Sequence, residues 1–512
     1  MYNSQQHTIT LKEKIRMHID LNRNSNIPLS VQIYQSISDR IASGLIEKGA
    51  KLPSVRSLSK TLKVSLVTAV KAYSLLEKDN FIATIQGKGT YVQSEDVVNN
   101  NNPENNSTSL DWQLSITDHL PRAQFWRQNI NLNTKPQIQM SAAHVHSSLL
   151  PEQHISKHLS SLVLKNPSLL FEYGPIQGDL ELRTSIANYL KTKDVSLSAE
   201  EIVITNGSQQ AINLVARTFI GAGDVVIMEA PTYTAAIDVF RWQGATILSV
   251  PVDKEGMRID LLLKICDSYS PKLIYTIPSY HNPTGTVMSM QRRRELLHIA
   301  RDFNCLIVED DPWSEITFEK SFLPSIKSLD TSGRVIYIKG FSKFLAPGCR
   351  IGTVSASGSI LNRLVAAKAN SDLGSPLLTQ KALLPFLQSN FMEKHLKNLN
   401  SILIKRRNLA LKLLTEHMPN DVKWTVPQGG PNIWITLPSW MSAENLLFEA
   451  QSRNINFLPG STCYPSEPEF NHIRIGFCFL DEHQLKEGIL ALCSIISSFI
   501  DQKYSYNDIP II

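Results

Sequence analysis

A polar, asparagine-rich segment divides this chain into two parts of very different size. Residues 93–110 read QSEDVVNNNNPENNSTSL and contain few large apolar side chains. A segment of this composition buries too little surface to offset the entropy lost on ordering, so it predicts a flexible linker. Together with the polar and aromatic stretch that follows, we assign the linker to residues 93–135. It separates a head at residues 28–92 from a body at residues 136–500.

Positive charge is concentrated in the head. The chain has 51 Lys and Arg against 46 Asp and Glu, a net charge of +5. Residues 28–92 contain nine basic and four acidic side chains, a net of +5, and residues 1–27 add +2, so the rest of the chain sums to −2. A small basic module beside a near-neutral body indicates a part that binds a polyanion. The sequence assigns no role to residues 1–27.

Composition excludes several other classes of protein. Hydrophobic residues make up 42% and charged residues 19% of the chain, which excludes a disordered or fibrous protein. The six cysteines lie in the second half without CxxC spacing, so we expect buried, reduced thiols and no zinc site. No run approaches the ~20 apolar residues that cross a bilayer, and the polar N-terminus does not resemble a signal peptide. We therefore expect a cytoplasmic protein without a membrane segment or a metal.

The head has the pattern of a winged helix-turn-helix. We expect helices at Val31–Ser43, Val55–Leu62 and Val67–Lys78, with Ser65 as the N-cap of the third. The closing sequence FIATIQGKGTYV predicts a two-stranded wing with glycines at its tip. Two short helices joined by a tight turn and followed by such a wing are typical of DNA-binding modules.

At KLPSVRSL, at the pattern S-x-x-T-x-x-K-A-Y and at GKGTYV, the head resembles the GntR family of winged helix-turn-helix repressors. Leu66 stands where many relatives have an arginine that reads a base, so their usual base preference does not carry over. For any single lysine, a solvated basic surface without a specific role is the alternative. The resemblance implies DNA contacts from Arg56, Ser65, Thr68, Lys71 and Lys88.

The body alternates strand-like and helix-like stretches, which predicts an α/β fold with a mostly parallel central sheet covered by helices on both faces. After about residue 385 the pattern changes to longer helices with a few short strands, which indicates a smaller C-terminal lobe. The expected strands are Glu201–Thr205, Val225–Met228, Ala245–Val252, Leu273–Pro278, Cys305–Glu309, Val335–Lys339 and Ile351–Ser355.

Several polar residues directly follow these strands, at the edge where open α/β sheets bind ligands. The start of the helix after the first strand offers free N–H groups for an anion. A carboxylate that ends a buried strand needs a cationic partner, a lysine there can become a nucleophilic amine, and an arginine can pair with phosphate. An ordinary turn or helix cap remains an alternative at the first two sites. The residues are Ser208, Gln209, Asn282, Asp310, Lys343 and Arg350.

An anion site, a buried carboxylate, an amide, a lysine and an arginine in one cleft match the needs of pyridoxal phosphate. Across about residues 140–500 the chain resembles fold-type I pyridoxal-phosphate enzymes of the class I/II aminotransferase kind. The motifs that support this resemblance are Tyr173-Gly174, Gly178, Leu182-Arg183, Pro231-Thr232-Tyr233, NPTG, EDDP, FSK followed by Arg350, and finally Arg474.

The resemblance implies a role for each matching residue. Lys343 would form the Schiff base and Asp310 would pair with the ring nitrogen, and these are the two expected catalytic residues. Arg474 would hold the carboxylate of an effector, unless it makes only a structural ion pair. The other cofactor contacts would come from Ser208, Gln209, Ser342 and Arg350 at the phosphate, Asn282 at the phenolic oxygen and Tyr233 at the ring face. Tyr233 could instead be an ordinary core residue.

Two positions depart from the enzymes. Trp313 stands where a tyrosine usually bonds the phenolic oxygen, and indole offers only a donor at a different reach. Gly340 stands where a serine or threonine commonly contacts the phosphate, so one phosphate hydrogen bond is expected to be missing.

A GntR-like head joined to an aminotransferase-like body resembles the MocR group of transcriptional regulators. The resemblance implies a homodimer that binds an operator with paired half-sites and senses an amine, an amino acid or pyridoxal phosphate itself through the Schiff base. Two alternatives remain. One is an active aminotransferase with an accessory DNA-binding module, and the other is a body that only dimerises and holds no cofactor.

Overall fold

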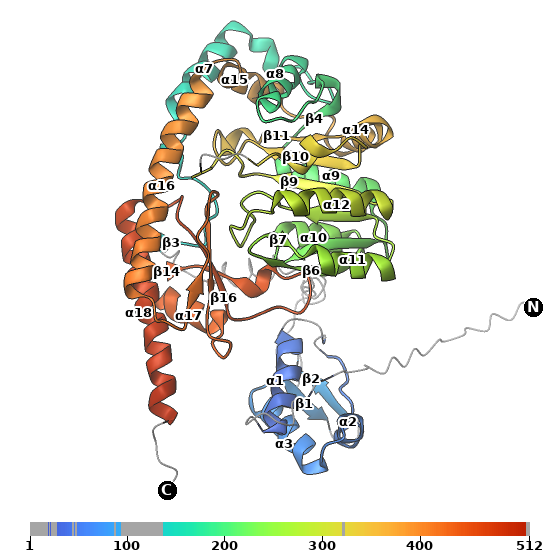
Figure 1. Cartoon of the computed structure of the whole chain (residues 1–512), viewed down its shortest axis with the longest axis vertical. Coiled ribbons are helices and arrows are strands. Elements are labelled where there is room, and N and C mark those ends of the chain that lie inside the picture. Colours follow the sequence, from blue (N-terminus) through green and yellow to red (C-terminus); the bar gives the residue numbers. More distant parts are fainter. Residues whose placement is uncertain are drawn as a thin grey trace, which may run out of the picture. The chain divides into compact units, whose positions relative to one another are not determined.

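The computed structural model describes Ile19, Leu21, residues 28–42, Ile46, 49–85, 89–93, 137–319 and 323–507. Its contacts divide the chain into two compact units, Met1–His119 and Leu120–Ile512 (Figure 1). Lys88, nearly all of the predicted linker and most of residues 1–27 lie outside the described residues. Within the described part of the chain, no helix is long and apolar enough to cross a membrane.

The head has the predicted helix and strand order. Its elements are α1 (Leu29–Ala42), α2 (Val55–Leu62), α3 (Leu66–Lys78), β1 (Ile82–Ile85) and β2 (Gly89–Val92). The two strands pair antiparallel, with Ile82 opposite Val92, and form the wing. The three helices and the wing share one buried apolar cluster, to which each element contributes, as with Ile33, Leu58 and Leu76.

The turn between α2 and α3 is set by local hydrogen bonds. Lys63 adopts a left-handed conformation, with φ of 50°, and its N–H donates to the Ser59 carbonyl at the end of α2. Ser65 then caps α3, because its Oγ accepts a hydrogen bond from the Thr68 N–H at 3.0 Å. The predicted N-cap and the tight turn before it are confirmed.

Loss of this cap has a measurable consequence. In Ser65→Ala, the first turn of α3 loses a partner for one N–H group, which costs about 1 kcal/mol of local stability. Amide hydrogen exchange in that turn of the DNA-free protein is therefore expected to become about fivefold faster. Mass spectrometry of peptides from α3 measures this, with Ser57→Ala on α2 as the control. Equal exchange in the two variants would contradict the assigned cap.

The body is built on an eight-stranded sheet in the order β4-β11-β10-β9-β8-β5-β6-β7. The neighbours β10, β9, β8, β5 and β6 pair in parallel, whereas β11 and β7 run antiparallel to their neighbours. The mostly parallel sheet is thus confirmed. The strands are β4 (Ile202–Thr205), β5 (Val225–Ala230), β6 (Thr246–Asp253), β7 (Gly256–Met257), β8 (Leu273–Thr276), β9 (Leu306–Asp311), β10 (Val335–Gly340) and β11 (Gly352–Ser355).

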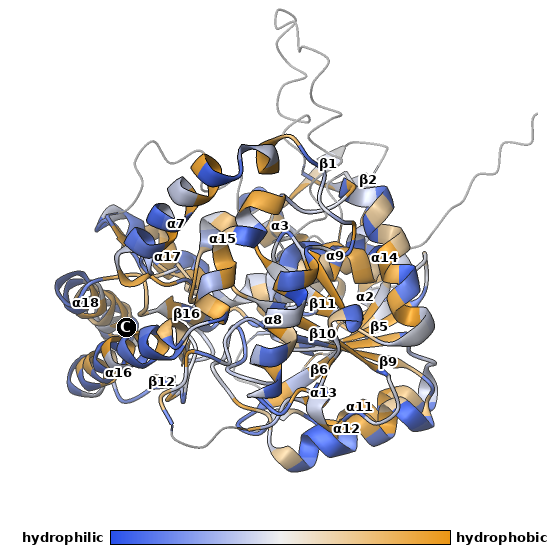
Figure 2. Ribbon diagram, turned by 90° about the horizontal axis from the view of Figure 1, so that it is seen from above, coloured by the Kyte–Doolittle hydropathy of each residue, from blue (hydrophilic) through white to orange (hydrophobic). Residues whose placement is uncertain are grey.

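Helices cover both faces of this sheet. One apolar cluster joins the sheet to α9 (Ser208–Phe219), α10 (Thr234–Trp242) and α14 (Gly358–Asp372). A second joins the opposite face to α11 (Ile259–Ser268), α12 (Met290–Asp302) and α13 (Ile326–Leu329). Figure 2 shows hydrophobic colours along the strands and hydrophilic colours on the outward turns of α12. The strands are apolar on both faces because neither face meets water.

The smaller lobe contains a four-stranded antiparallel sheet flanked by long helices. Its strands are β12 (Lys423–Trp424), β13 (Asn432–Thr436), β15 (Leu458–Pro459) and β16 (His472–Gly476), and its helices are α16 (Phe391–His417), α17 (Ala443–Ser452) and α18 (Glu482–Asn507). In addition, β3 (Ile138–Gln139), at the start of the body, pairs in parallel with β14 (Ile455–Asn456). A lobe that begins only near residue 385 is therefore too simple, because the N-terminal segment of the body belongs to it.

Three further helices pack together beside the large sheet: α7 (Glu152–Lys165), α8 (Leu180–Lys191) and α15 (Leu377–Leu387). All six cysteines are free thiols, as expected, and five of them are buried, whereas Cys349 is half-buried. The described residues contain no group of His, Cys, Asp or Glu that would hold a metal ion.

Candidate active site

Lys343 follows β10 at the carboxyl edge of the large sheet. Its Nζ donates a hydrogen bond to the Ala143 carbonyl at 3.2 Å and lies 5.3 Å from the centre of the Trp313 ring. Burial and the nearby positive charges of Arg474 and Arg350 lower the pKa of Lys343 to about 8. A larger share of this amine is therefore unprotonated near neutral pH than for an exposed lysine, which favours reaction with an aldehyde.

Asp310 lies on the neighbouring strand β9 and is 2% exposed. The sequence predicted that the strand ends at Glu309 and that Asp310 follows it. The strand instead continues through Asp311, so Asp310 lies within it. Its Oδ2 accepts a hydrogen bond from the Tyr275 hydroxyl at 2.7 Å, whereas its Oδ1 has no partner among the described residues. Burial raises the pKa of Asp310 to about 7. An unpaired buried carboxylate oxygen fits the protonated ring nitrogen of a pyridine cofactor.

Arg474 and Asn282 meet between the two lobes, since Arg474 belongs to β16 and Asn282 follows β8. Arg474 Nη1 donates to Asn282 Oδ1 at 3.1 Å, and Nη2 donates to the Ser141 carbonyl at 2.5 Å. Asn432 Nδ2 donates to the same Asn282 oxygen at 3.3 Å. All acceptors of Arg474 in the described part of the chain are neutral oxygens, so its buried charge remains available to an anion. This arrangement disfavours the structural ion pair that the sequence left open.

The start of α9 forms a cradle for an anion. Its N-cap Gly207 has a φ of +86°, and a Cβ there would lie 2.7 Å from Arg350 Nη2. Arg350 Nη2 also donates to the Asn206 carbonyl at 3.0 Å, which holds the guanidinium against the turn. The Tyr233 hydroxyl donates to Gln209 Oε1 at 3.1 Å. Backbone N–H groups, a helix N-terminus and a guanidinium thus converge as a phosphate requires.

The structure gives a steric reason for a glycine at residue 340. A Cβ at this position would lie 2.6 Å from the Oγ of Ser208, closer than a Cβ approaches an atom to which it is not bonded. Ser208 therefore takes the place that a side chain at residue 340 would fill. Where the enzymes commonly have a serine or threonine at this position, this chain has the hydroxyl of Ser208 from the start of α9.

A side chain at residue 340 is consequently expected to harm the site. In Gly340→Ser, the new Cβ displaces Ser208, and the affinity for pyridoxal phosphate falls by about tenfold, as from the loss of one charge-assisted hydrogen bond. Fluorescence titration with the cofactor measures the affinity. In the double variant Gly340→Ser with Ser208→Ala, most of the affinity returns. If the single variant binds as tightly as the parent, the proposed conflict between the two side chains is wrong.

The low pKa of Lys343 predicts how cofactor incorporation depends on pH. The unprotonated amine is the reactive form, so the rate rises about tenfold per pH unit below pH 8 and levels off above it. An ordinary lysine would give a rate that still rises between about pH 8 and 10. Stopped-flow absorbance after mixing the apoprotein with pyridoxal phosphate measures this profile. The absence of a plateau above pH 8 would contradict the assigned environment.

Several residues that complete the site were not predicted from the sequence. Tyr275 reaches Asp310 from β8, Asn432 reaches Asn282 from β13, and the Ser141 and Ala143 carbonyls come from the segment after β3. A tyrosine within the apolar strand LIYT is the only available signal, because a buried hydroxyl needs a partner. Backbone carbonyls leave no trace in a sequence.

On the opposite face of β9, a buried charged network holds the strand in place. Asp311 accepts hydrogen bonds from Lys339 Nζ at 3.0 Å and from the Tyr337 hydroxyl at 2.6 Å. Lys339 also pairs with Glu315, which accepts from the Tyr189 hydroxyl at 2.7 Å. The two consecutive aspartates therefore differ in function, since Asp310 faces the candidate site and Asp311 fixes β9 to β10.

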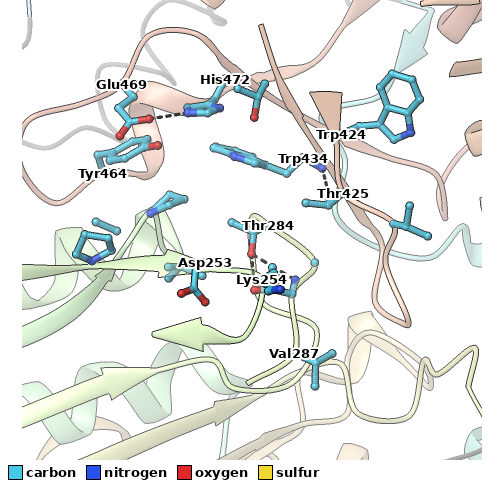
Figure 3. A pocket seen from close by; sticks show the side chains of 18 of the residues that line it. Asp253, Lys254, Thr284, Val287, Trp424, Thr425, Trp434, Tyr464, Glu469 and His472 are labelled. Atoms are coloured by element: carbon cyan, nitrogen blue, oxygen red, sulfur yellow. Dashed lines mark hydrogen bonds and ion pairs between the residues drawn. The ribbon is translucent and has the colours of Figure 1, made fainter. Parts of the chain in front are cut away.

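A cavity of about 660 Å³ lies between the two lobes (Figure 3). On the small-lobe side, Trp434 stacks on His472 with ring centres 5.1 Å apart, and His472 Nε2 is 2.7 Å from Glu469 Oε2. On the large-lobe side, Asp253, Lys254 and the turn after Asn282 form the wall. None of the predicted cofactor residues lines this cavity. The cavity is therefore separate from the predicted cofactor contacts, although its wall includes Thr284, two residues after Asn282.

In the head, the residues predicted to contact DNA differ in their exposure and in their hydrogen bonds. Arg56 and Lys71 are exposed, on α2 and α3. The Ser65 and Thr68 hydroxyls lie 2.7 Å apart and are hydrogen-bonded to each other at the start of α3. Lys88 lies outside the described residues, so its role remains a prediction.

Comparison with family models divides the chain as its composition does. Residues 29–92 match bacterial regulatory proteins of the gntR family. Residues 147–492 match aminotransferase class I and II. The chain belongs to the aminotransferase class I and II family. To this aminotransferase-family body the chain adds a GntR head, and that head binds DNA.

Relatives of this aminotransferase-family chain include both regulators and enzymes. The uncharacterized HTH-type transcriptional regulator YisV of Bacillus subtilis is 31% identical over 92% of this chain and 96% of its own length. The aromatic-amino-acid aminotransferase 1 of Thermococcus litoralis is 34% identical, over 68% of this chain and 84% of the enzyme. The kynurenine aminotransferase of Pyrococcus horikoshii, solved in complex with PMP, superposes with a TM-score of 0.70 at 32% identity and covers 74% of this chain and 95% of the enzyme.

Proposed function

We propose that this protein is a transcriptional regulator that binds DNA through its head and senses an amine or amino acid through a pyridoxal-phosphate site in its body. The observation that carries the proposal is the combination of the two parts in one chain. A GntR head is joined to a site in which Lys343, Asp310 and Arg474 have the environments that cofactor and effector need. The match with YisV over nearly the full length of both chains supports the same architecture for a regulator.

The residues present fit pyridoxal phosphate. Bound in this site, the cofactor supplies an aldehyde and an electron-accepting ring. The start of α9, with Ser208, Gln209 and Arg350, binds the phosphate, and Ser342 lies beside Lys343 to complete this end. Asp310 holds a proton on the ring nitrogen, Asn282 bonds the phenolic oxygen, and Tyr233 covers the ring. Lys343 provides the amine to which the aldehyde bonds.

With the cofactor bound, an amine effector would compete with the Lys343 amine for the aldehyde. If it is an amino acid, Arg474 binds its carboxylate. Lys343, whose pKa burial and nearby arginines lower to about 8, would as a free amine be able to accept a proton. Because Arg474 belongs to the small lobe and Asp310 to the large one, a ligand that contacts both favours a closer approach of the lobes. The cavity between them provides the space for this movement.

A homodimer that reads paired half-sites completes the proposal. Support comes from several exposed apolar side chains between residues 164 and 180 of the body, since exposed apolar surface often marks an interface between proteins. Phe171 is 85% and Tyr173 89% exposed, and Leu164, Leu170 and Leu180 lie near them in the sequence and are also exposed. Two identical heads would match a palindromic operator by symmetry.

One experiment tests both effector binding and its effect on DNA binding. The purified protein is loaded with pyridoxal phosphate and titrated with each amino acid, while the absorbance near the visible edge and the binding of upstream DNA are measured in parallel. We expect at least one amino acid or amine to change both signals at the same concentration. An absorbance change without any effect on DNA binding would contradict the sensor.

The second candidate is an active aminotransferase, which is favoured by a site that retains Lys343, Asp310, Asn282 and Arg474. Sustained turnover of amino acids with 2-oxoglutarate would support the enzyme, whereas a single turnover per site would support the regulator. A protein that remains colourless after addition of excess cofactor would support the third alternative, a body that only dimerises.

A further inference from the structure

The recognition helix α3 has apolar side chains on two faces. Ala69, Ala72 and Leu76 are fully buried and pack in the core of the head. On the outward side, Leu66 is 47%, Val67 76% and Val70 47% exposed. Packing of α3 in the head needs only the buried residues. The exposed Leu66, Val67 and Val70 are three branched apolar side chains near the N-terminus of α3, which Ser65 caps.

Basic residues accompany this outward set on the same helix and on the helix and turn before it. Arg56 and Lys60 on α2, Lys63 in the turn and Lys71 on α3 are all exposed. From Val55 to Leu76 the sequence contains no acidic residue, and the first ones are Glu77 and Asp79. The exposed apolar side chains thus lie in a helix-turn-helix segment whose charges are all positive. Such charges fit the phosphates of a duplex, whereas a hydrophobic protein partner or a membrane interior would not require them.

The polar groups at the start of α3 are already engaged. The Ser65 Oγ accepts from the Thr68 N–H at 3.0 Å and shares a hydrogen bond of 2.7 Å with the Thr68 hydroxyl. Leu66, which lies between them, has no hydrogen-bonding group in its side chain. The exposed side chains of Leu66, Val67 and Val70 can therefore make only apolar contacts.

We propose that Leu66, Val67 and Val70 form a thymine-reading surface, in which they contact the methyl groups of thymines in the major groove. Among the base edges in that groove, only thymine presents an apolar group, its C5 methyl. A side chain without donors or acceptors gains nothing from the polar edges of guanine, cytosine or adenine. This inference rests on the DNA-binding function proposed above and adds the base that the helix selects.

The test uses the full-length protein and removes single methyl groups from DNA. Duplexes that bind are first selected from a random pool, and each thymine of the selected half-site is then replaced by deoxyuridine, which lacks only the methyl group. We expect thymines at two or three positions of the half-site, and a loss of affinity of about fourfold for each contacted methyl. Measurement is by fluorescence anisotropy at fixed salt concentration.

Protein variants identify which side chain makes each contact. In Val67→Ala, the penalty for deoxyuridine at one position is expected to disappear, because the contact is already lost. Val67 is 76% exposed, so its truncation leaves the core of the head intact, and thermal unfolding verifies this. Lys71→Ala is the matched control on the same helix. It should weaken binding to thymine and deoxyuridine duplexes equally and reduce the dependence on salt.

The outcomes separate this inference from the function on which it rests. If no duplex is selected, DNA binding and thymine reading are both overturned. If duplexes are selected but deoxyuridine leaves their affinity unchanged, only the thymine-reading surface is overturned. A Val67→Ala protein that binds DNA more tightly, or that changes its oligomeric state, would place another part of this chain on the surface and would equally contradict the inference.

Discussion

Lys343→Ala is expected to abolish the absorbance band near the visible edge that pyridoxal phosphate gives when it is bonded to a lysine amine. The variant retains the phosphate cradle at the start of α9, so the cofactor still binds, but reversibly, and dialysis removes it. After dialysis the variant holds no aldehyde with which an effector amine could react, so it should also lose the response of DNA binding to the effector. Absorbance spectra before and after dialysis, with DNA titrations, measure both effects.

The matched control is Lys412→Ala, which removes an exposed lysine from α16, where it lies 3.8 Å from Glu416. It should leave the band and the DNA response unchanged. Binding of DNA without effector should be the same in both variants and in the parent, because the head is intact. If Lys343→Ala keeps the band after dialysis, the cofactor is attached elsewhere and the assigned role of Lys343 is wrong.

Arg474→Ala is expected to reduce the affinity for an amino-acid effector by about 100-fold, which corresponds to a charge-assisted pair worth about 3 kcal/mol. Arg474 is 8% exposed, and its acceptors in the described residues are neutral, so a carboxylate gains a strong partner there. The cofactor band should remain, because Lys343 and Asp310 are not altered. Titration of that band with amino acids measures the loss.

A comparison of ligands separates this effect from damage to the fold. An amine that lacks the carboxylate, such as the decarboxylation product of each amino acid, makes no use of Arg474. Its affinity should therefore be nearly the same in parent and variant, while the preference for the amino acid over the amine disappears. An equal loss for both ligands, or a lower melting temperature of the loaded protein, would indicate that Arg474 is structural.

The sequence determined the helices of the head and the class of the body. Ser65 before an apolar-periodic stretch predicted the start of α3 because a hydroxyl N-cap acts within four residues. Apolar runs such as the predicted strand Leu273–Pro278, observed as β8 (Leu273–Thr276), indicated strands because both of their faces are covered by helices. These are local effects, so the residues that produce them are adjacent in the chain.

Strand ends were less certain. The sequence placed Asp310 after its strand, whereas β9 continues through Asp311, because Lys339 and Tyr337 of the neighbouring strand provide partners for a second carboxylate. These partners are more than 25 residues away. Separation along the chain also explains why Gly340 suggested a lost phosphate contact, although Ser208 from another element fills its space.

By itself, the sequence determined which chemical groups are present: a lysine, an aspartate, an asparagine and an arginine at or near predicted strand ends, and a second arginine, Arg474, through the resemblance to aminotransferases. Only the tertiary structure decided their environments. It left one oxygen of Asp310 without a partner among the residues that the structure describes, and it placed Arg474 against Asn282. It also brought the Ser141 and Ala143 carbonyls into the site from a segment that follows β3, which pairs with the small lobe. The physical reason is that burial and charge depend on all neighbours in space, and most of these neighbours are distant in the chain.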